Sequence, residues 1–162
     1  MSKPIYRHQR FINICANYVR ILENKMQYLT GLYALNLPCP SLKTCGDWHL
    51  YAIDWETPLI LDSEKSVFKN FGIIDAVFAI PLKKYMPAAN HIRALLDLLE
   101  LGKFNLAQGM RDDFICNDTY NQLIFSKVDL LKKSKNWEEI NEFMKKEYAF
   151  QWQKHLNEVT NK

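Results

Sequence analysis

No stretch of this 162-residue chain is apolar over the roughly 18–20 residues that a helix needs to cross a bilayer. Its first residues also lack the continuous apolar segment and small-residue cleavage site of a secretory signal. There is no internal repeat, no low-complexity tract and no Gly/Ser linker. These absences predict a cytoplasmic protein without a membrane partner, folded as one domain over residues 1–162.

Cysteine is scarce as well, with four residues scattered at positions 15, 39, 45 and 116. A chain of this size builds a core without disulfides, so we expect free thiols in a reducing compartment. Cys39 and Cys45 have no second Cys/His pair near them, which argues against a zinc site.

The chain also contains none of the common catalytic or cofactor motifs. A Gly-rich phosphate loop, a Gly-x-Ser-x-Gly elbow, a His-Glu-x-x-His pair and a Cys-x-x-Cys pair are all missing. The sequence therefore predicts no cofactor and no metal, and it favours a protein that is not an enzyme.

What the chain does have is a high aromatic content, 13%, within a composition that is 48% hydrophobic and 24% charged. This balance is typical of a folded protein and not of a disordered one. The formal net charge is +3, and basic and acidic residues are mixed along the whole chain. No segment is basic enough to act as a nucleic-acid-binding arm.

Hydrophobic periodicity predicts an α+β fold. Apolar residues recur at helical spacing over residues 5–35, which predicts a long N-terminal helix that ends before Pro38. Segments 47–56, 58–62 and 72–80 carry the aromatic and β-branched residues of strands, which predicts a small, mostly antiparallel sheet of about three strands. Residues 63–71 leave room for one helical turn.

The rest of the chain, from Pro87 onward, predicts a helical cluster packed on one face of the sheet. Asn90 is expected to cap a helix that stops at Gly102. A short helical segment at 104–110, a helix capped by Asn117 or Asp118, and a last helix starting near Asn136 follow. The last helix carries one apolar stripe composed of Trp137, Ile140, Met144, Tyr148, Trp152, His155 and Val159.

The densest group of reactive side chains lies in residues 45–56, with the sequence CGDWHLYAIDWE. If this segment is a strand, Asp47 and His49 share one face while Asp54 and Glu56 share the other. Carboxylates on opposite faces cannot converge on one ion, so a two-sided packed strand is the favoured interpretation. A functional Asp47–His49 pair is the alternative.

Asp75 is the second candidate, because it interrupts the apolar run GIIDAVFAI. A carboxylate buried there would need a partner or a raised pKa, and such groups are frequent in active sites. The ordinary interpretation places Asp75 at a sheet edge or beside a cation such as Arg93 or Lys83.

Two further groups are candidates for binding. Arg111 and Asp112 belong to a polar segment, GMRDDFICND, whose ordinary role is to form a loop with helix caps. Arg7, Arg10 and Arg20 form a basic stripe on the predicted N-terminal helix.

The sequence as a whole favours a small protein that binds another protein, of the antitoxin, immunity or inhibitor, or accessory-subunit type. Abundant aromatic residues of the kind that form interface cores support this. The first alternative is a metal-dependent hydrolase or nuclease built from Asp47, His49 and Asp75, with a contribution from residues 109–118. The second alternative is a nucleic-acid-binding module that uses the arginine stripe. The sequence does not determine the oligomeric state.

Overall fold

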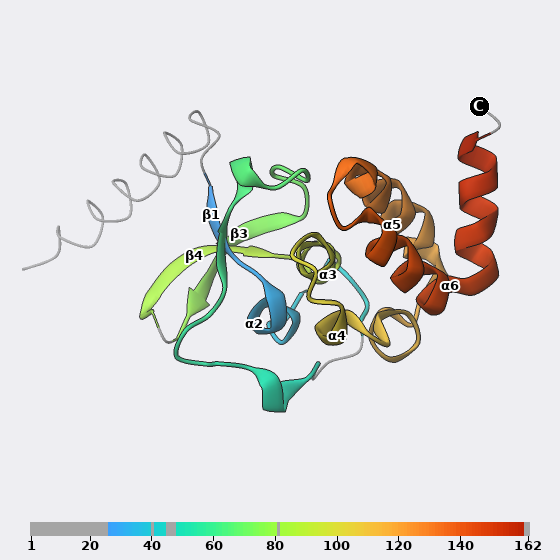
Figure 1. Ribbon diagram of the computed structural model, residues 1–162. Helices are drawn as coiled ribbons and strands as arrows, with labels where there is room; N and C mark the ends of the chain where they lie inside the picture. The colour runs from blue at the N-terminus through green and yellow to red at the C-terminus, as the bar shows by residue number, and fades with distance from the viewer. Residues whose placement is uncertain (1–25, 40, 45–47, 81, 161–162) are drawn as a thin grey trace, which may run out of the picture.

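The computed structural model describes residues 26–39, 41–44, 48–80 and 82–160. Within them the fold is α+β, with a four-stranded mixed sheet in the order β2-β1-β4-β3. The strands are β1 (Gln27–Leu29), β2 (Ile60–Asp62), β3 (Ile73–Ala79) and β4 (Lys84–Ala89). Figure 1 shows the sheet on one side of the molecule and helices α5 and α6 on the other.

The sheet pairs β1 with β2 and β3 with β4 in antiparallel fashion, and β1 lies parallel to β4 through Leu29 and Ala88. The register of β3 on β4 shifts between Ile74 and Val77, so two residues of β3 lie opposite Pro87 alone. Proline has no N–H to donate, so a β-bulge at this point sacrifices little of the ladder. The bulge contains Asp75.

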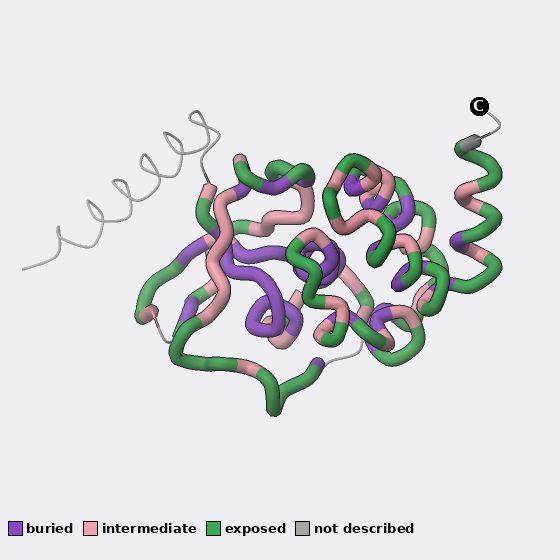
Figure 2. Tube along the Cα trace, in the orientation of Figure 1, coloured by how far each residue is buried: buried purple, intermediate pink, exposed green. Residues whose placement is uncertain are grey.

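Helix α3 (His91–Glu100) is the centre of the molecule. Asn90 caps it by accepting a hydrogen bond from the Arg93 N–H at 2.8 Å, and the short helix α2 (Gly31–Leu35) packs beside it. Nine of its ten residues are buried, and Figure 2 shows both helices as buried tubes between the sheet and the remaining helices. A helix that is covered on all sides must satisfy its polar groups internally.

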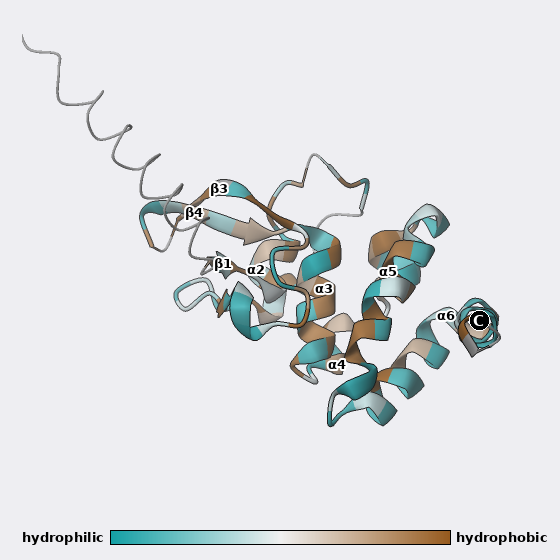
Figure 3. Ribbon diagram, turned by 90° about the horizontal axis from the view of Figure 1, so that it is seen from above, coloured by the Kyte–Doolittle hydropathy of each residue, from teal (hydrophilic) through white to brown (hydrophobic). Residues whose placement is uncertain are grey.

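The remaining helices lie beside and below α3, with α5 and α6 in the right-hand part of the view from above in Figure 3. They are α4 (Phe104–Ala107), a π-helical turn η3 (Met110–Ile115), α5 (Asn121–Val128) and α6 (Trp137–Thr160), with 3-10 turns η4 (Asp118–Tyr120) and η5 (Asp129–Lys133). Their apolar side chains join those of α3 and β1 in one large core.

Helix α6 is broken at Ala149, whose backbone has φ 43° and ψ −120°. The chain folds back at this point, so that Trp152 donates a hydrogen bond to Asn141 at 2.9 Å across the break. The Trp152 side chain is fully buried and packs on Phe125. The apolar residues predicted to form one straight stripe therefore lie on two helical segments that meet at the break.

Several predictions from the sequence are confirmed. The strands at 60–62 and 73–79, the 3-10 turn η2 (Ser63–Lys65), the Asn90 cap, and helices α4, α5 and α6 lie where the sequence placed them. Asn117 caps η4 by accepting from the Thr119 N–H. No helix in the described part of the chain is long and apolar enough to span a membrane.

The predicted continuous helix over residues 5–35 is wrong for residues 26–30, where β1 lies; Gly31–Leu35 is helical, but as the separate short helix α2, and residues 5–25 lie outside the described residues. The sequence missed two strands, β1 and β4, and one of its three predicted strands, at 47–56, does not form over its described part, so the described sheet has four strands. β1 has only three residues, and Pro87 within β4 disguised a strand that is central in the sheet.

The predicted strand at 47–56 is also wrong over its described part, since residues 48–56 form a loop with one 3-10 turn, η1 (Leu50–Ala52). Asn36 explains this difference, because its amide accepts from the Trp48 N–H at 2.8 Å and donates to the Trp48 carbonyl at 2.7 Å. Asp54 in turn accepts from the N–H groups of Glu56 and Thr57. Side chains thus take the backbone hydrogen bonds that a neighbouring strand would have supplied.

Candidate functional site: an acidic groove between α4 and α6

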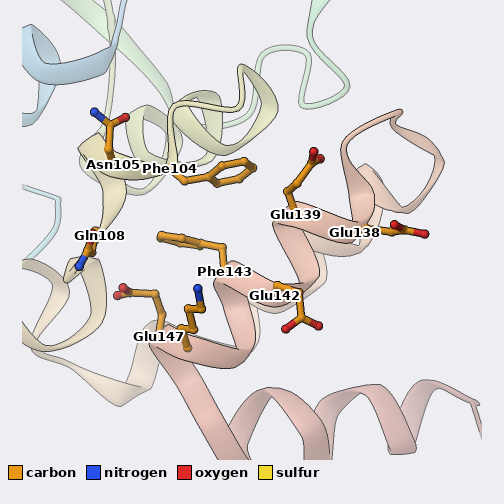
Figure 4. Close-up of a pocket in the computed structure, with 9 residues that line it drawn as sticks. Phe104, Asn105, Gln108, Glu138, Glu139, Glu142, Phe143 and Glu147 are labelled. Carbon is orange, nitrogen blue, oxygen red and sulfur yellow. The ribbon is translucent and has the colours of Figure 1, made fainter.

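A groove of about 710 Å³ lies between helix α4 with the turn that follows it and the first half of α6. Its volume is in the usual range for a ligand site. Figure 4 shows the rings of Phe104 and Phe143 next to each other, with glutamates along α6. The residues that line it are Phe104, Asn105, Gln108, Glu138, Glu139, Glu142, Phe143, Lys146 and Glu147.

The aromatic part of the groove is built by two helices. The ring centroids of Phe104 and Phe143 are 5.6 Å apart, with the rings tilted by 32°. Phe143 is buried, and Phe104 is half-buried and borders the opening. Ring faces carry a partial negative charge, so an aromatic wall beside carboxylates attracts cations.

The acidic part follows from the sequence of α6, where Glu138, Glu142 and Lys146 repeat at a spacing of four, as do Glu139, Phe143 and Glu147. Residues four apart share a helix face, so both series line the same groove. Glu138 and Glu139 also lie in the first turn of α6, where the helix dipole favours negative charge. Four glutamates against one lysine give the lining a formal charge of −3.

These carboxylates differ in their present partners. Glu147 accepts hydrogen bonds from the backbone N–H groups of Gly109 at 2.8 Å and Arg111 at 3.4 Å, so it fixes the end of the groove. Glu142 is 2.6 Å from Lys145, which holds the pKa of this exposed carboxyl below its usual range. No hydrogen bond or ion pair joins the side chain of Glu138 or Glu139 to another described residue. These two carboxylates are available to a ligand.

Arg111 and Asp112, predicted as binding residues, lie beside the groove and do not line it. The Arg111 guanidinium is 3.1 Å from Asp112 and 3.6 Å from Asp118, and it lies 6.0 Å from the centre of the Tyr148 ring. Its backbone, through Glu147, connects η3 to the wall of the groove. Their role in binding stays a prediction.

The residues predicted for catalysis do not form a described cluster. His49 is an exposed residue at the start of η1, and Asp75 is exposed in the bulge of β3, the edge strand; Figure 1 shows η1 below the sheet. Asp75 therefore lies at a sheet edge, which is one of the two positions that its ordinary interpretation allowed. Asp47 lies outside the described residues, as do Arg7, Arg10 and Arg20. Among the residues that are described, no three His, Cys, Asp or Glu side chains converge as a metal site.

The most elaborate polar cluster is buried in the core and is saturated with internal partners. The Arg93 guanidinium donates to Asp97 at 2.7 Å, to the Tyr28 hydroxyl at 2.5 Å, and to the carbonyls of Lys69 and Phe71 at 2.6 Å. Asp97 also accepts from Tyr28 and Thr30. Burial raises the pKa of Asp97, while the Arg93 charge and these hydrogen bonds act in the opposite direction. This network ties α3 to β1 and to the loop before β3, and it is structural.

The sequence contained one signal for the groove: Phe143 is an aromatic residue among acidic residues of the last helix. Hydrophobic periodicity did not reveal it, because the apolar stripe marks the core face of that helix and the groove uses the adjacent face. Only the position of α4 turns that face into a concave site. Comparisons with family models, with curated proteins and with solved structures found no match for this chain.

Proposed function

We propose that this protein binds another protein, and that the groove between α4 and α6 is a contact site for that partner. The observation that carries the proposal is the groove itself: a concave site with an aromatic wall and two carboxylates that have no partner among the described residues. Protein interfaces are enriched in aromatic side chains, and their most important residues fill pockets of this kind.

The position of the groove supports this role. The carboxylates are spread along α6 and do not surround one point, as a catalytic acid–base pair or a metal site would require. From Glu138 to Glu147 the helix advances nine residues, or about 14 Å at 1.5 Å per residue. A site of this length suits about four residues of an extended chain at roughly 3.3 Å each.

The test places a bulky cation in the groove without removing a contact. Asn105 is exposed and lines the groove, so Asn105→Arg should block it, while Gln122→Arg makes the same kind of change at an exposed position of α5 outside it. Affinity capture from extracts of the source cells, followed by direct binding of the purified partner, should show a protein that binds the wild type and Gln122→Arg but not Asn105→Arg. Equal binding to all three would contradict the proposal.

A second candidate is nucleic-acid binding at the β3–β4 hairpin. Phe78 and Tyr85 lie with ring centroids 5.1 Å apart on this hairpin, 47% and 71% exposed, beside the exposed Lys83 and Lys84. Exposed rings next to lysines suit stacked bases and phosphates. Labelled single-stranded RNA should bind with a salt-dependent affinity that Tyr85→Ala weakens by about fivefold or more, as expected for the loss of one stacked base at about 1–3 kcal/mol. Salt-independent or unaltered binding would exclude this candidate.

A further inference from the structure

We infer that the occupant of the groove is a short extended segment of the partner that carries lysine or arginine side chains. The inference rests on the proposed function, and it adds the chemistry of the partner. The inference is supported by charge complementarity, because a lining with a formal charge of −3 around an aromatic pair favours a positively charged occupant.

The groove offers a basic side chain two kinds of contact. The alkyl stem of a lysine or arginine packs on apolar surface while its charged end remains near polar groups. Phe104 and Phe143 supply that apolar surface. Glu138 and Glu139, which have no partner among the described residues, supply the carboxylates at the end of the groove nearest the start of α6.

The distribution of charge favours a peptide over a single small cation. Glu139 and Glu147 are two helical turns apart, so one ammonium group cannot reach both. Glu147 is moreover held by the backbone of Gly109 and Arg111. An extended chain with basic residues at alternate positions presents its charges at intervals of about 7 Å, comparable to the roughly 6 Å between carboxylates one helical turn apart.

The described part of the chain does not supply enough positive charge to neutralise the groove. Lys146 is the one basic residue among the described residues that line it, and Lys145, which pairs with Glu142 at 2.6 Å, lies outside the lining. The carboxylates near the start of α6 therefore remain uncompensated by the described part of the chain. A partner that brings its own positive charges neutralises this excess.

The test uses the full chain and a short fluorescein-labelled peptide that carries two lysines, with anisotropy as the readout. Its counterpart with two glutamates should not bind. The double variant Glu138→Gln/Glu139→Gln should weaken binding of the lysine peptide by about two- to thirtyfold, the loss of two exposed ion pairs. Phe104→Leu keeps the apolar volume but removes the aromatic face, and should weaken binding by about two- to fivefold.

Glu158→Gln is the matched control, because Glu158 is an exposed carboxylate of the same helix that lies outside the groove. It should leave binding unchanged. Equal weakening by Glu158→Gln, or unchanged binding by the Glu138/Glu139 double variant, would overturn the inference and indicate nonspecific attraction. Displacement of the peptide by spermine at a lower concentration than by unlabelled peptide would also overturn it, in favour of a small polycation.

The two proposals fail in different ways. If Asn105→Arg loses a captured partner while the lysine peptide does not bind the wild type, the protein-binding function stands and the basic occupant is wrong. If the lysine peptide binds but no protein distinguishes Asn105→Arg from Gln122→Arg, the charge preference of the groove stands without a protein partner, and both proposals are wrong as stated.

Discussion

Arg93 and Asp97 are completely buried, although charged side chains are among the residues least often found in protein interiors. They are stable there because they pair with each other and are hydrogen-bonded on nearly every side. The guanidinium donates four hydrogen bonds, to one carboxylate, one hydroxyl and two carbonyls, and the carboxylate accepts from two hydroxyls as well as from Arg93. A buried pair of this kind adds little net stability, but removal of one member leaves an uncompensated charge in the core.

Asp97→Asn should therefore lower the free energy of unfolding by about 3–5 kcal/mol, because Arg93 would lose its counter-charge inside the core. The double variant Arg93→Met/Asp97→Leu should cost less than the two single variants added together. Urea unfolding of the four proteins measures both effects. A single variant that unfolds like the wild type would show that the pair is not buried.

His91 provides a second prediction for a single residue. Its Nε2 lies 2.8 Å from the Leu37 carbonyl, which accepts, so this nitrogen carries the proton and Nδ1 accepts from the Thr44 hydroxyl. Phe114 packs on the ring, and burial lowers the pKa of His91. The folded state thus binds a proton less readily than the unfolded chain, whose histidine has a pKa near 6.5.

Stability from His91 is fully present above about pH 6.5 and is lost as the pH falls below that value, by at most about 1.4 kcal/mol per pH unit. Comparison of urea unfolding at about pH 7 and about pH 5 should show a smaller loss for His91→Gln than for the wild type. His49→Gln, at an exposed histidine, should retain the wild-type loss. The same pH dependence in all three proteins would exclude His91 as its source.

Among the helices, α6 departs from the continuous helix that its sequence pattern predicts. Its first half forms the wall of the groove, and its second half folds back to bury Trp152 against Phe125. The change of direction takes place at Ala149, whose positive φ of 43° is a conformation that glycine adopts more readily than residues with a Cβ. The break also ends the run of acidic residues at the groove.

Ala149→Gly should raise the free energy of unfolding by about 1 kcal/mol, because strain of about 1–3 kcal/mol is relieved and part of it is offset by the greater freedom of glycine when unfolded. Ala94→Gly, within the regular helix α3, is the control and should lower stability by about 1 kcal/mol or more. Thermal and urea unfolding report both. If Ala149→Gly destabilised the protein as Ala94→Gly does, α6 would be continuous.

At the scale of the whole molecule, Trp48 connects the segment between α2 and β2 to the helical part. Its indole N–H donates to the Leu106 carbonyl at 2.9 Å, and its ring lies 5.1 Å from that of Phe114. Asn36 holds its backbone from the other side. Trp55, only seven residues later, is 47% exposed and lies against Tyr33.

Trp48→Ala should thus cost about 3–5 kcal/mol, the usual loss for a large buried aromatic residue. Trp55→Ala should change stability by less than about 1 kcal/mol, because much of that ring already contacts water. Trp48→Phe, which loses the hydrogen bond to Leu106 but keeps most of the ring, should fall between them. Equal effects at both positions would restore the interpretation of residues 48–56 as a packed two-sided strand.

The sequence by itself determined what depends on neighbours in the chain. The Asn90 cap and the leucines that follow it specify α3, and Asn117 specifies η4, because capping and helical periodicity act over three or four residues. Only the tertiary structure decided the rest. Asn36 makes a loop of a segment rich in strand-forming residues, and Pro87 enters a central strand because a bulge at Asp75 lies opposite it. The groove depends on the packing of α4 against α6, because its aromatic pair comes from residues 39 positions apart in sequence that no local pattern relates.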